Sequence, residues 1–211
     1  MQHFFDGGET RKARLTVAIT GASGALFSAH LLRLLAGDDR VEHAHLVVSD
    51  HALRVLAEEM QISNGRSGLL ACLLDGAPAD KFTLLRNDDI GAPIASGSHP
   101  SDGMIVLPCS MGTLASIANG MASRLIDRAA DVTLKEQRPL ILCVRETPFN
   151  RIHLRNMTLA AEAGAVIYPV IPAMYFKPQG LDEIARQFCC RVLAHLGLEQ
   201  PGAYQWKPTD I

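Results

Sequence analysis

The stretch LTVAITGASGALFSAHLLRLLAG, residues 15–37, decides the fold. Its first six residues favour a β-strand, a glycine closes that run, and apolar residues then recur at helical spacing up to Gly37. In the turn between them, GASG at 21–24, small residues let the backbone approach an anion while the helix start presents unpaired N–H groups. The turn therefore predicts a phosphate site, although an ordinary capped turn explains a lone glycine motif equally well.

The spacing of this turn narrows the kind of ligand. It does not match the GxGxxG fingerprint of dinucleotide-binding proteins, and no lysine follows it as in a P-loop. We therefore expect the phosphate of a nucleotide-like monophosphate.

Composition bounds the class of protein. Of the 211 residues, 48% are hydrophobic and 20% charged, which is enough for one sizeable core. The net charge of −2 gives no general attraction to nucleic acid or anionic membranes, and no stretch approaches the ~20 apolar residues of a membrane span.

The five cysteines form neither a CxxC pair nor a disulfide framework. We expect a cytoplasmic protein with a loose leader at 1–14, one domain at 15–198 and a tail at 199–211.

Strand and helix signals alternate along the rest of the chain. The region 61–103 is rich in Gly, Ser, Asn, Asp and Pro and is expected to be mostly loop, with a strand only near 82–85. Alternation of this kind predicts a single-domain α/β fold with a doubly wound, mostly parallel sheet, Rossmann-like or flavodoxin-like. Further strands are expected at 45–48, 104–107, 140–144 and 166–168, and helices at 50–60, 113–119, 123–136, 152–163 and 181–196.

Ligands of such sheets bind at the carboxyl ends of the strands, and polar residues stand at those positions. Ser49 and Asp50 follow the second strand, where a hydroxyl or acceptor could contact a ribityl or ribose chain, although helix capping explains both residues equally well. The segment 108–113 opens another helix with hydroxyls and amides, and its Cys109 is expected to be a small buried residue. Arg145 and Glu146 end an apolar strand, which suggests anion binding and proton transfer rather than a surface ion pair.

Other polar residues have structural explanations. The charges from 124 to 136 fall at helical intervals and indicate a solvated helix face. The two histidines at 43 and 45 share a strand face without a third ligand, so we expect no metal site, and His153 is explained by helix capping. Tyr175 in a stiff proline-rich loop and Arg191 in the last helix could be ordinary surface residues.

Taken together, long blocks of the chain between about 15 and 198 resemble the flavin prenyltransferases, the UbiX family. The region 61–90 and the termini carry little of this resemblance. The blocks are GASGA at 21–25, PCSMGTLASIANG at 108–120, LIDRAADVTLKEQRPLILCVRETPFNRIHLRNM at 125–157, PAMYF at 172–176 and RVLAHLGL at 191–198.

The resemblance implies transfer of a dimethylallyl group from dimethylallyl monophosphate to N5 and C6 of reduced FMN, without a metal. The product, prenylated FMN, would serve a partner decarboxylase in ubiquinone-type or aromatic-acid metabolism. FMN is then a substrate. By matching position, the resemblance implies FMN-binding roles for Gly21, Ala22, Ser23, Ser49, Ser110, Met111, Gly112, Thr113, Arg145 and Arg128, donor-binding roles for Tyr175, Arg191 and Lys135, and catalytic roles for Glu146, Lys135, Ser23 and Glu59.

The chemistry explains these residue types. Charge develops on the departing phosphate as flavin N5 attacks the allylic carbon, and Arg191, Lys135 and Tyr175 would supply cations and a donor for it. Ring closure at C6 releases a proton, which Glu146 or the released phosphate would accept. One residue departs from the family pattern, because Ile90 stands where some members carry an aromatic side chain. The resemblance also implies a homo-oligomer, a dodecamer, with sites at subunit interfaces.

Three alternatives remain at this point. A flavin-dependent cysteine decarboxylase of the same fold would carry a PASANT-like block where this chain has PCSMGT at 108–113. A non-catalytic FMN carrier could dispense with Lys135, Glu146, Tyr175 and Arg191, all of which are present. A short-chain NAD(P) oxidoreductase would need a dinucleotide fingerprint and a Tyr-x-x-x-Lys pair, and the chain has neither.

Overall fold

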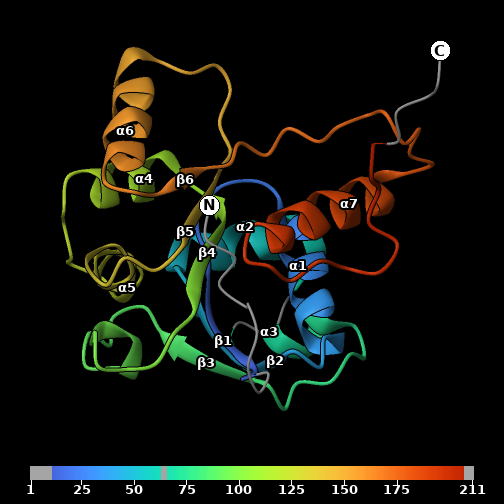
Figure 1. Cartoon of the computed structure of the whole chain (residues 1–211), viewed down its shortest axis with the longest axis horizontal. Coiled ribbons are helices and arrows are strands. Elements are labelled where there is room, and N and C mark those ends of the chain that lie inside the picture. The colour runs from blue at the N-terminus through green and yellow to red at the C-terminus, as the bar shows by residue number, and fades with distance from the viewer. Residues whose placement is uncertain (1–10, 63–65, 207–211) are drawn as a thin grey trace.

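The computed structural model describes residues 11–62 and 66–206. Most of the expected leader and the last residues of the expected tail therefore lie outside the described residues. The described chain forms one sheet of six parallel strands in the order β3-β2-β1-β4-β5-β6 (Figure 1). The strands are β1 (Ala13–Ile19), β2 (Val41–Val48), β3 (Phe82–Arg86), β4 (Gly103–Cys109), β5 (Leu140–Val144) and β6 (Val166–Ile167).

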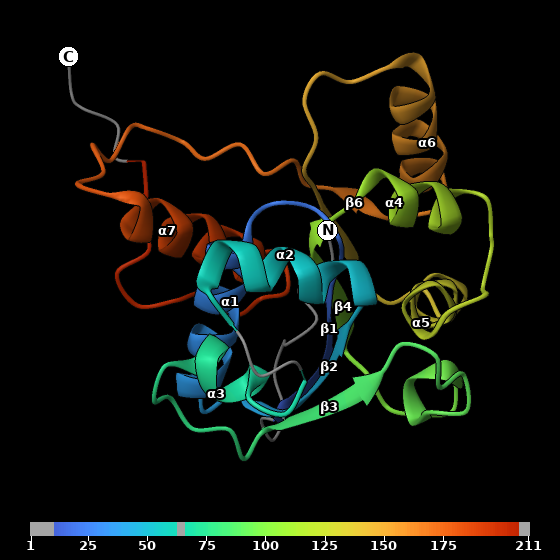
Figure 2. The same ribbon diagram turned by 180° about the vertical axis from the view of Figure 1, so that it is seen from behind.

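Helices cover both faces of this sheet (Figures 1 and 2). On one face pack α1 (Ala25–Gly37), α3 (Leu69–Leu74) and α7 (Leu181–Ala194), with α2 (Asp50–Met60) beside α1. On the other face pack α4 (Met111–Ala118), α5 (Leu125–Lys135) and α6 (Arg151–Glu162). This strand order is that of the doubly wound Rossmann fold, so the predicted fold class is confirmed.

The side chains of β1 show why its sequence is a continuous apolar run. Val17 and Ile19 enter the core under α1 and α7, whereas Ala18 between them enters the core under α4 and α5. Successive side chains of a strand point to opposite faces, and both faces of this sheet are buried. The order of strands reverses direction between β1 and β4, which makes their carboxyl ends the expected place for a ligand.

The region 61–103 is mostly loop, as its composition predicts, but it also contains a helix that its composition does not indicate. It contains α3, β3 and a short 3-10 turn, η1 (Pro93–Ala95). Leu69, Leu73 and Leu74 of α3 are buried, but the run is too short to show a full amphipathic period, and glycines flank it. The expectation of mostly loop is confirmed, because α3, β3 and η1 together hold only 14 residues, and β3 confirms the strand expected near 82–85. The helix α3 and the turn η1 were not predicted.

Smaller expectations have mixed outcomes. Ser49, not Asp50, caps α2, since its hydroxyl accepts the N–H of Ala52 at 3.1 Å. His153 does take part in a capping box with Asn150 at the start of α6, as expected. Cys109 is fully buried, and burial raises the pKa of its thiol to about 12. No helix in the described part of the chain is long and apolar enough to cross a membrane.

Candidate functional site

A hydrogen-bonded joint holds the carboxyl ends of β1 and β4 together. The backbone N–H and the hydroxyl of Thr20 both donate to the Pro108 carbonyl, at 3.2 and 2.8 Å. The Ser110 N–H in turn donates to the Thr20 hydroxyl at 2.8 Å. Thr20 is only 1% exposed, so this joint is shielded from water. It fixes the turn after β1 next to the start of α4, the two segments that the sequence singles out.

A cavity of about 540 Å³ opens at this edge of the sheet, and we call it the hydroxyl cavity. Seven residues expected to bind FMN or act in catalysis line it: Gly21, Ser49, Ser110, Met111, Gly112, Thr113 and Glu146. Asp50, which follows the second strand as Ser49 does, also lines it. The structure adds seven lining residues that sequence reasoning did not assign to the site: His51, Asn87, Ser116, Ser123, Arg124, Ile126 and Asp127.

Three helices begin at the hydroxyl cavity. The N-cap residues of α2, α4 and α5 are Ser49, Ser110 and Arg124, and all three line it. Each helix N-terminus carries a partial positive charge and unpaired N–H groups. Gly112, in the first turn of α4, has open space where a side chain would stand, so a ligand can approach the backbone there. This arrangement suits an anionic group with several oxygens.

The turn at 21–24 has a different partner from the one expected. Glu59, on α2, accepts the N–H of Gly24 at 3.0 Å and that of Ala25 at 2.8 Å. Burial tends to raise the pKa of Glu59, but hydrogen bonds from Ser23, Ala25 and Gly24 and the charge of Arg145 lower it overall. A carboxylate of the protein thus occupies the N-terminus of α1. Glu59 thus interacts with both Ser23 and Arg145. The described lining of the hydroxyl cavity includes none of these three residues, and it does not include Ala22.

The start of α5 corrects the expectation of a solvated helix face. Asp127 is only 7% exposed and faces the cavity. Burial raises the pKa of this carboxyl, although hydrogen bonds from the Arg124 backbone and the Ser123 hydroxyl oppose the rise. Periodic charge alone could not reveal this, because the residues that cover Asp127 come from other elements.

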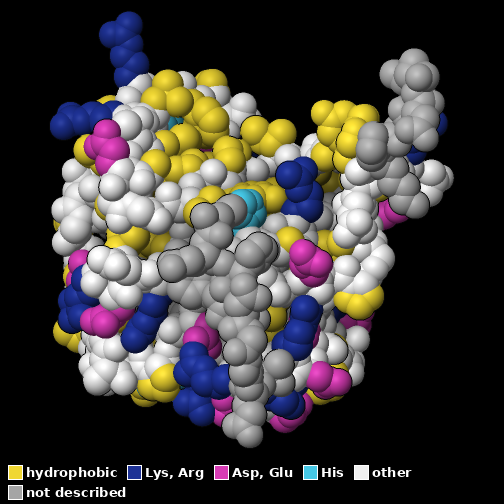
Figure 3. All heavy atoms as spheres, viewed as in Figure 1, with side chains coloured by type: hydrophobic (Ala, Val, Ile, Leu, Met, Phe, Trp, Pro, Cys, Tyr) yellow, Lys and Arg dark blue, Asp and Glu magenta, His cyan; other side chains and the backbone are white. Residues whose placement is uncertain are grey.

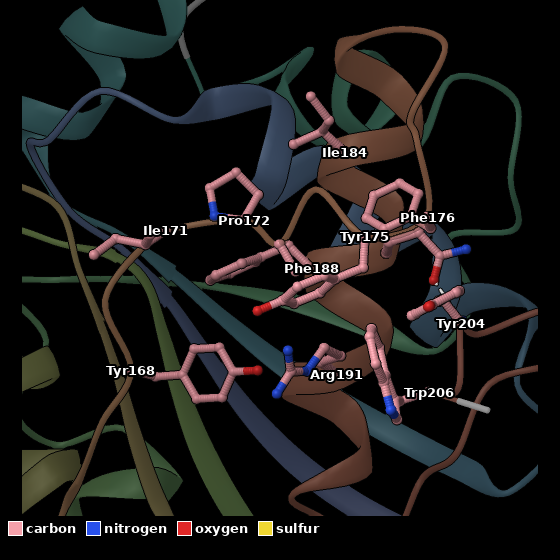
Figure 4. A pocket seen from close by; sticks show the side chains of 12 residues that line it. Tyr168, Ile171, Pro172, Tyr175, Phe176, Ile184, Phe188, Arg191, Tyr204 and Trp206 are labelled. Carbon is pink, nitrogen blue, oxygen red and sulfur yellow. Dashed lines mark hydrogen bonds between the residues drawn. The ribbon is translucent and has the colours of Figure 1, made fainter. Parts of the chain in front are cut away.

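A second cavity, of about 470 Å³, lies between α7 and the segments before and after it, and we call it the aromatic cavity (Figure 4). It brings Tyr175 and Arg191 together, as the resemblance implies for the donor site. In Figure 4 the Arg191 side chain lies between Tyr168 and Trp206. Burial raises the pKa of Tyr168, and the positive charge of Arg191 opposes the rise. The rest of the lining is Ile171, Pro172, Ala173, Phe176, Ile184, Gln187, Phe188 and Tyr204.

The C-terminal segment closes one wall of the aromatic cavity. Gln187 of α7 accepts the Tyr204 N–H at 2.8 Å and donates to the Gly202 carbonyl at 2.9 Å, and Arg186 donates to the Pro201 carbonyl at 2.7 Å. The Trp206 ring meets the Tyr175 ring edge to face, with centroids 5.2 Å apart. The sequence interpretation treated this segment as a tail. Its aromatic residues in a polar stretch were the signal that could have found it.

Two expected site residues lie on α5 away from both cavities. Arg128 donates to the Ala95 carbonyl at 3.1 Å and pairs with Asp131 at 2.7 Å. Lys135 pairs with Glu136 where α5 meets the loop at Gly97. Neither residue is among the described lining of either cavity, and the same holds for Ile90, which is 60% exposed. Within one chain the structure does not bring Lys135 to Glu146.

Comparison with known proteins identifies the family. A family model described as Flavoprotein matches residues 6–186. The flavin prenyltransferase UbiX of Salmonella typhimurium is 47% identical over 188 residues, which cover 89% of this chain and 94% of that protein. The UbiX protein of Methanocaldococcus jannaschii is 40% identical, over 92% of this chain and 98% of that protein.

Solved structures give the same result. A crystal structure of AnUbiX in complex with FMN and dimethylallyl pyrophosphate has a TM-score of 0.83 and 38% identity, over 95% of this chain and all of that one. A dodecameric FMN-dependent UbiX-like decarboxylase from Escherichia coli O157:H7 has a TM-score of 0.82 and 40% identity, over 92% of this chain and all of that one. A cysteine decarboxylase, SpaF, shares only the fold, at 20% identity over 76% of this chain and 85% of its own, with a TM-score of 0.54. The chain therefore belongs to the flavoprotein family and, within it, to the UbiX flavin prenyltransferases.

Proposed function

We propose that this flavin prenyltransferase moves a dimethylallyl group from dimethylallyl monophosphate to reduced FMN and uses its two cavities for the two substrates. The observation that carries this division is their contrasting chemistry. The hydroxyl cavity offers serine and threonine hydroxyls and three helix N-termini, whereas the aromatic cavity offers rings and one guanidinium.

The hydroxyl cavity fits FMN. Its volume of about 540 Å³ lies within the usual range for cofactor sites. The phosphate would lie at the convergence of α2, α4 and α5, with Ser49, Ser110 and Thr113 as hydroxyl partners. The turn at 21–24 would not bind the phosphate, because Glu59 already accepts the N–H groups of Gly24 and Ala25.

The aromatic cavity fits the prenyl donor. A five-carbon chain is apolar and gains free energy from burial, and aromatic faces attract the positive charge that develops on an allylic carbon. Arg191 would bind the phosphate of the donor, since a guanidinium matches the geometry of phosphate oxygens. Tyr175 and Trp206, in edge-to-face contact, would cover the bound chain and exclude water.

Glu146 is the group we assign to proton transfer. It lines the hydroxyl cavity, and its carboxylate accepts the backbone N–H of Thr147 at 2.9 Å, which orients it. As the bond to N5 forms, the allylic carbon–oxygen bond breaks and phosphate leaves with the N5 proton. Ring closure then adds a proton to the alkene of the prenyl chain, forms the bond to C6 and removes the C6 proton, so Glu146 or the released phosphate would carry a proton from C6 to the alkene. Ser23 and Glu59, hydrogen-bonded to each other, would position the flavin edge near the turn at 21–24.

Arg128 and Lys135 would act on the cavity of a neighbouring subunit. They face neither cavity of their own chain, although the resemblance assigns them to the site. A homo-oligomer supplies the missing contact, and the dodecameric relative supports one. Exposed apolar residues also gather at the α6 end of the molecule, with Phe149, Ile152 and Leu154 at 38, 68 and 51% exposure (Figure 3).

The product would pass to a decarboxylase that uses prenylated FMN, in the cytoplasm. Five free thiols, four of them buried, suit a reducing compartment.

The function is tested by anaerobic incubation of the protein with reduced FMN and dimethylallyl monophosphate. Mass spectrometry should find a flavin with one added five-carbon unit. Glu146→Gln should slow its formation while FMN stays bound, and unchanged turnover would remove Glu146 from the mechanism.

A further inference from the structure

The hydroxyl cavity has an unusual balance of charge. Among its described lining residues, Asp50, Asp127 and Glu146 are acidic, and Arg124 is the only lysine or arginine. A phosphate monoester carries about −1.5 to −2 charges at neutral pH. Such a group would meet carboxylates in this cavity, and helix N-termini alone are weak partners for a dianion.

The acidic residues near Arg124 already have partners. Asp50 pairs with Arg66 at 2.7 Å. Asp127 accepts hydrogen bonds from the Arg124 backbone and the Ser123 hydroxyl. The exposed guanidinium of Arg124, by contrast, makes no hydrogen bond or ion pair at contact distance with any other residue that the structure describes, although its positive charge helps to lower the pKa of Asp127. Its charge is therefore available to a ligand.

The local structure gives no reason for an arginine at this position. Arg124 is the N-cap of α5, where short polar side chains are preferred and a positive charge is unfavourable. Its side chain makes no capping hydrogen bond. Asn87 caps α5 instead. Its backbone carbonyl accepts the Leu125 N–H at 2.9 Å, and its side-chain carbonyl accepts the Ile126 N–H at 3.1 Å.

We propose that Arg124 is the counter-ion of the FMN phosphate and that it sets the preference of this enzyme for FMN over riboflavin. The inference rests on the proposed use of the hydroxyl cavity for FMN. The guanidinium offers two parallel N–H donors to phosphate oxygens, and Ser116 and Ser123 line the same cavity. Riboflavin lacks the phosphate, so the Arg124 guanidinium should add nothing to its binding free energy.

The test compares the affinities of two flavins for four proteins: wild type, Arg124→Ala, Arg124→Lys and the control Arg155→Ala. Arg155 is an exposed arginine on α6 that does not line the cavity. Titrations would follow the quenching of flavin fluorescence, and circular dichroism would verify folding.

We expect Arg124→Ala to raise the Kd for FMN about 10- to 100-fold while the Kd for riboflavin changes less than about threefold. Arg124→Lys keeps the charge but loses the paired donors, so it should recover only part of the FMN affinity, and Arg155→Ala should match wild type. An equal loss for both flavins, or an unchanged FMN affinity in Arg124→Ala, would overturn the assignment. If wild type prefers FMN through Arg124 but forms no prenylated product, the proposed function fails while this inference stands.

Discussion

The carboxylate of Glu59 accepts the N–H of Ala25 at 2.8 Å and so closes the N-terminus of α1. The positive end of this helix therefore meets a charge of the protein itself. A helix end with a bound carboxylate is a poor site for a second anion, because the two negative charges would repel each other. Under the proposed function the phosphate of FMN would therefore lie at the N-termini of α2, α4 and α5, whose N-cap residues line the hydroxyl cavity.

Glu59 should accordingly contribute to stability. Glu59→Ala removes a helix cap, and we expect it to lower the free energy of unfolding by about 1 kcal/mol, measured by urea denaturation. Glu58→Gln, on the exposed neighbour, is the matched control and should have little effect. Equal destabilisation by the two changes would show that the contact with α1 is energetically unimportant.

The contribution of Glu59 should also depend on pH. Its pKa is lowered in the folded chain, so the carboxylate stabilises the fold above the unfolded pKa and loses this effect as pH falls through the folded pKa. The difference in unfolding free energy between wild type and Glu59→Gln should therefore shrink in acid. A difference that stays constant down to pH 3 would contradict the assignment.

His45 predicts a second pH effect. Burial, and then the charges of His43 and His99, lower its pKa to about 4, and its Nε2 lies 3.1 Å from that of His99. The unfolded side chain titrates near pH 6.5, so the folded state favours neutral His45, and stability should fall as pH drops from about 6.5 towards 4. His45→Gln should flatten this dependence in urea denaturation. An equally steep fall in the variant would mean that other groups cause it.

Arg191 should act on the donor and not on the flavin. Arg191→Met leaves the apolar wall of the aromatic cavity but removes its charge, and we expect kcat/KM for dimethylallyl monophosphate to fall about 10- to 100-fold. FMN affinity should stay unchanged, which serves as the internal control. Arg191→Lys should recover part of the loss. A matching fall in FMN affinity would show that the two cavities do not separate the substrates.

The proposed sharing of the site between subunits predicts complementation. Lys135→Ala and Glu146→Gln should each lower activity strongly as homo-oligomers. When the two variants are dissociated and reassembled together, about a quarter of the sites should receive an intact Lys135 and an intact Glu146 from different subunits. Product formation by the mixture should therefore exceed that of either variant. A mixture no more active than its components would place both residues in one chain's site.

The sequence predicts the sheet well because a strand that is buried on both faces has a nearly continuous apolar sequence, as β1 and β5 do. Polar residues at strand ends correctly indicate much of the hydroxyl cavity, including Ser49, Ser110 and Glu146. These are local signals. They depend on the order of residues along a strand or turn and on the general rule that ligands bind at the carboxyl ends.

What the sequence could not predict depends on tertiary contact. Asp127 looks like part of a solvated face until other elements cover it, and Trp206 joins the aromatic cavity only because Gln187 and Arg186 hold the C-terminal segment. The partner of the turn at 21–24, Glu59, lies more than 30 positions away. Under the proposed function Lys135 would act in a neighbouring subunit's cavity, a contact that neither periodicity nor spacing can indicate.

The most direct test of the central claim is the covalent structure of the flavin formed in one anaerobic turnover. Wild-type protein, reduced FMN and ¹³C-labelled dimethylallyl monophosphate would be combined, and the isolated flavin analysed by mass spectrometry and NMR. The account predicts a five-carbon unit joined to the flavin at both N5 and C6, with one phosphate released. Recovery of unmodified FMN alone, under conditions where both substrates are shown to bind, would contradict it.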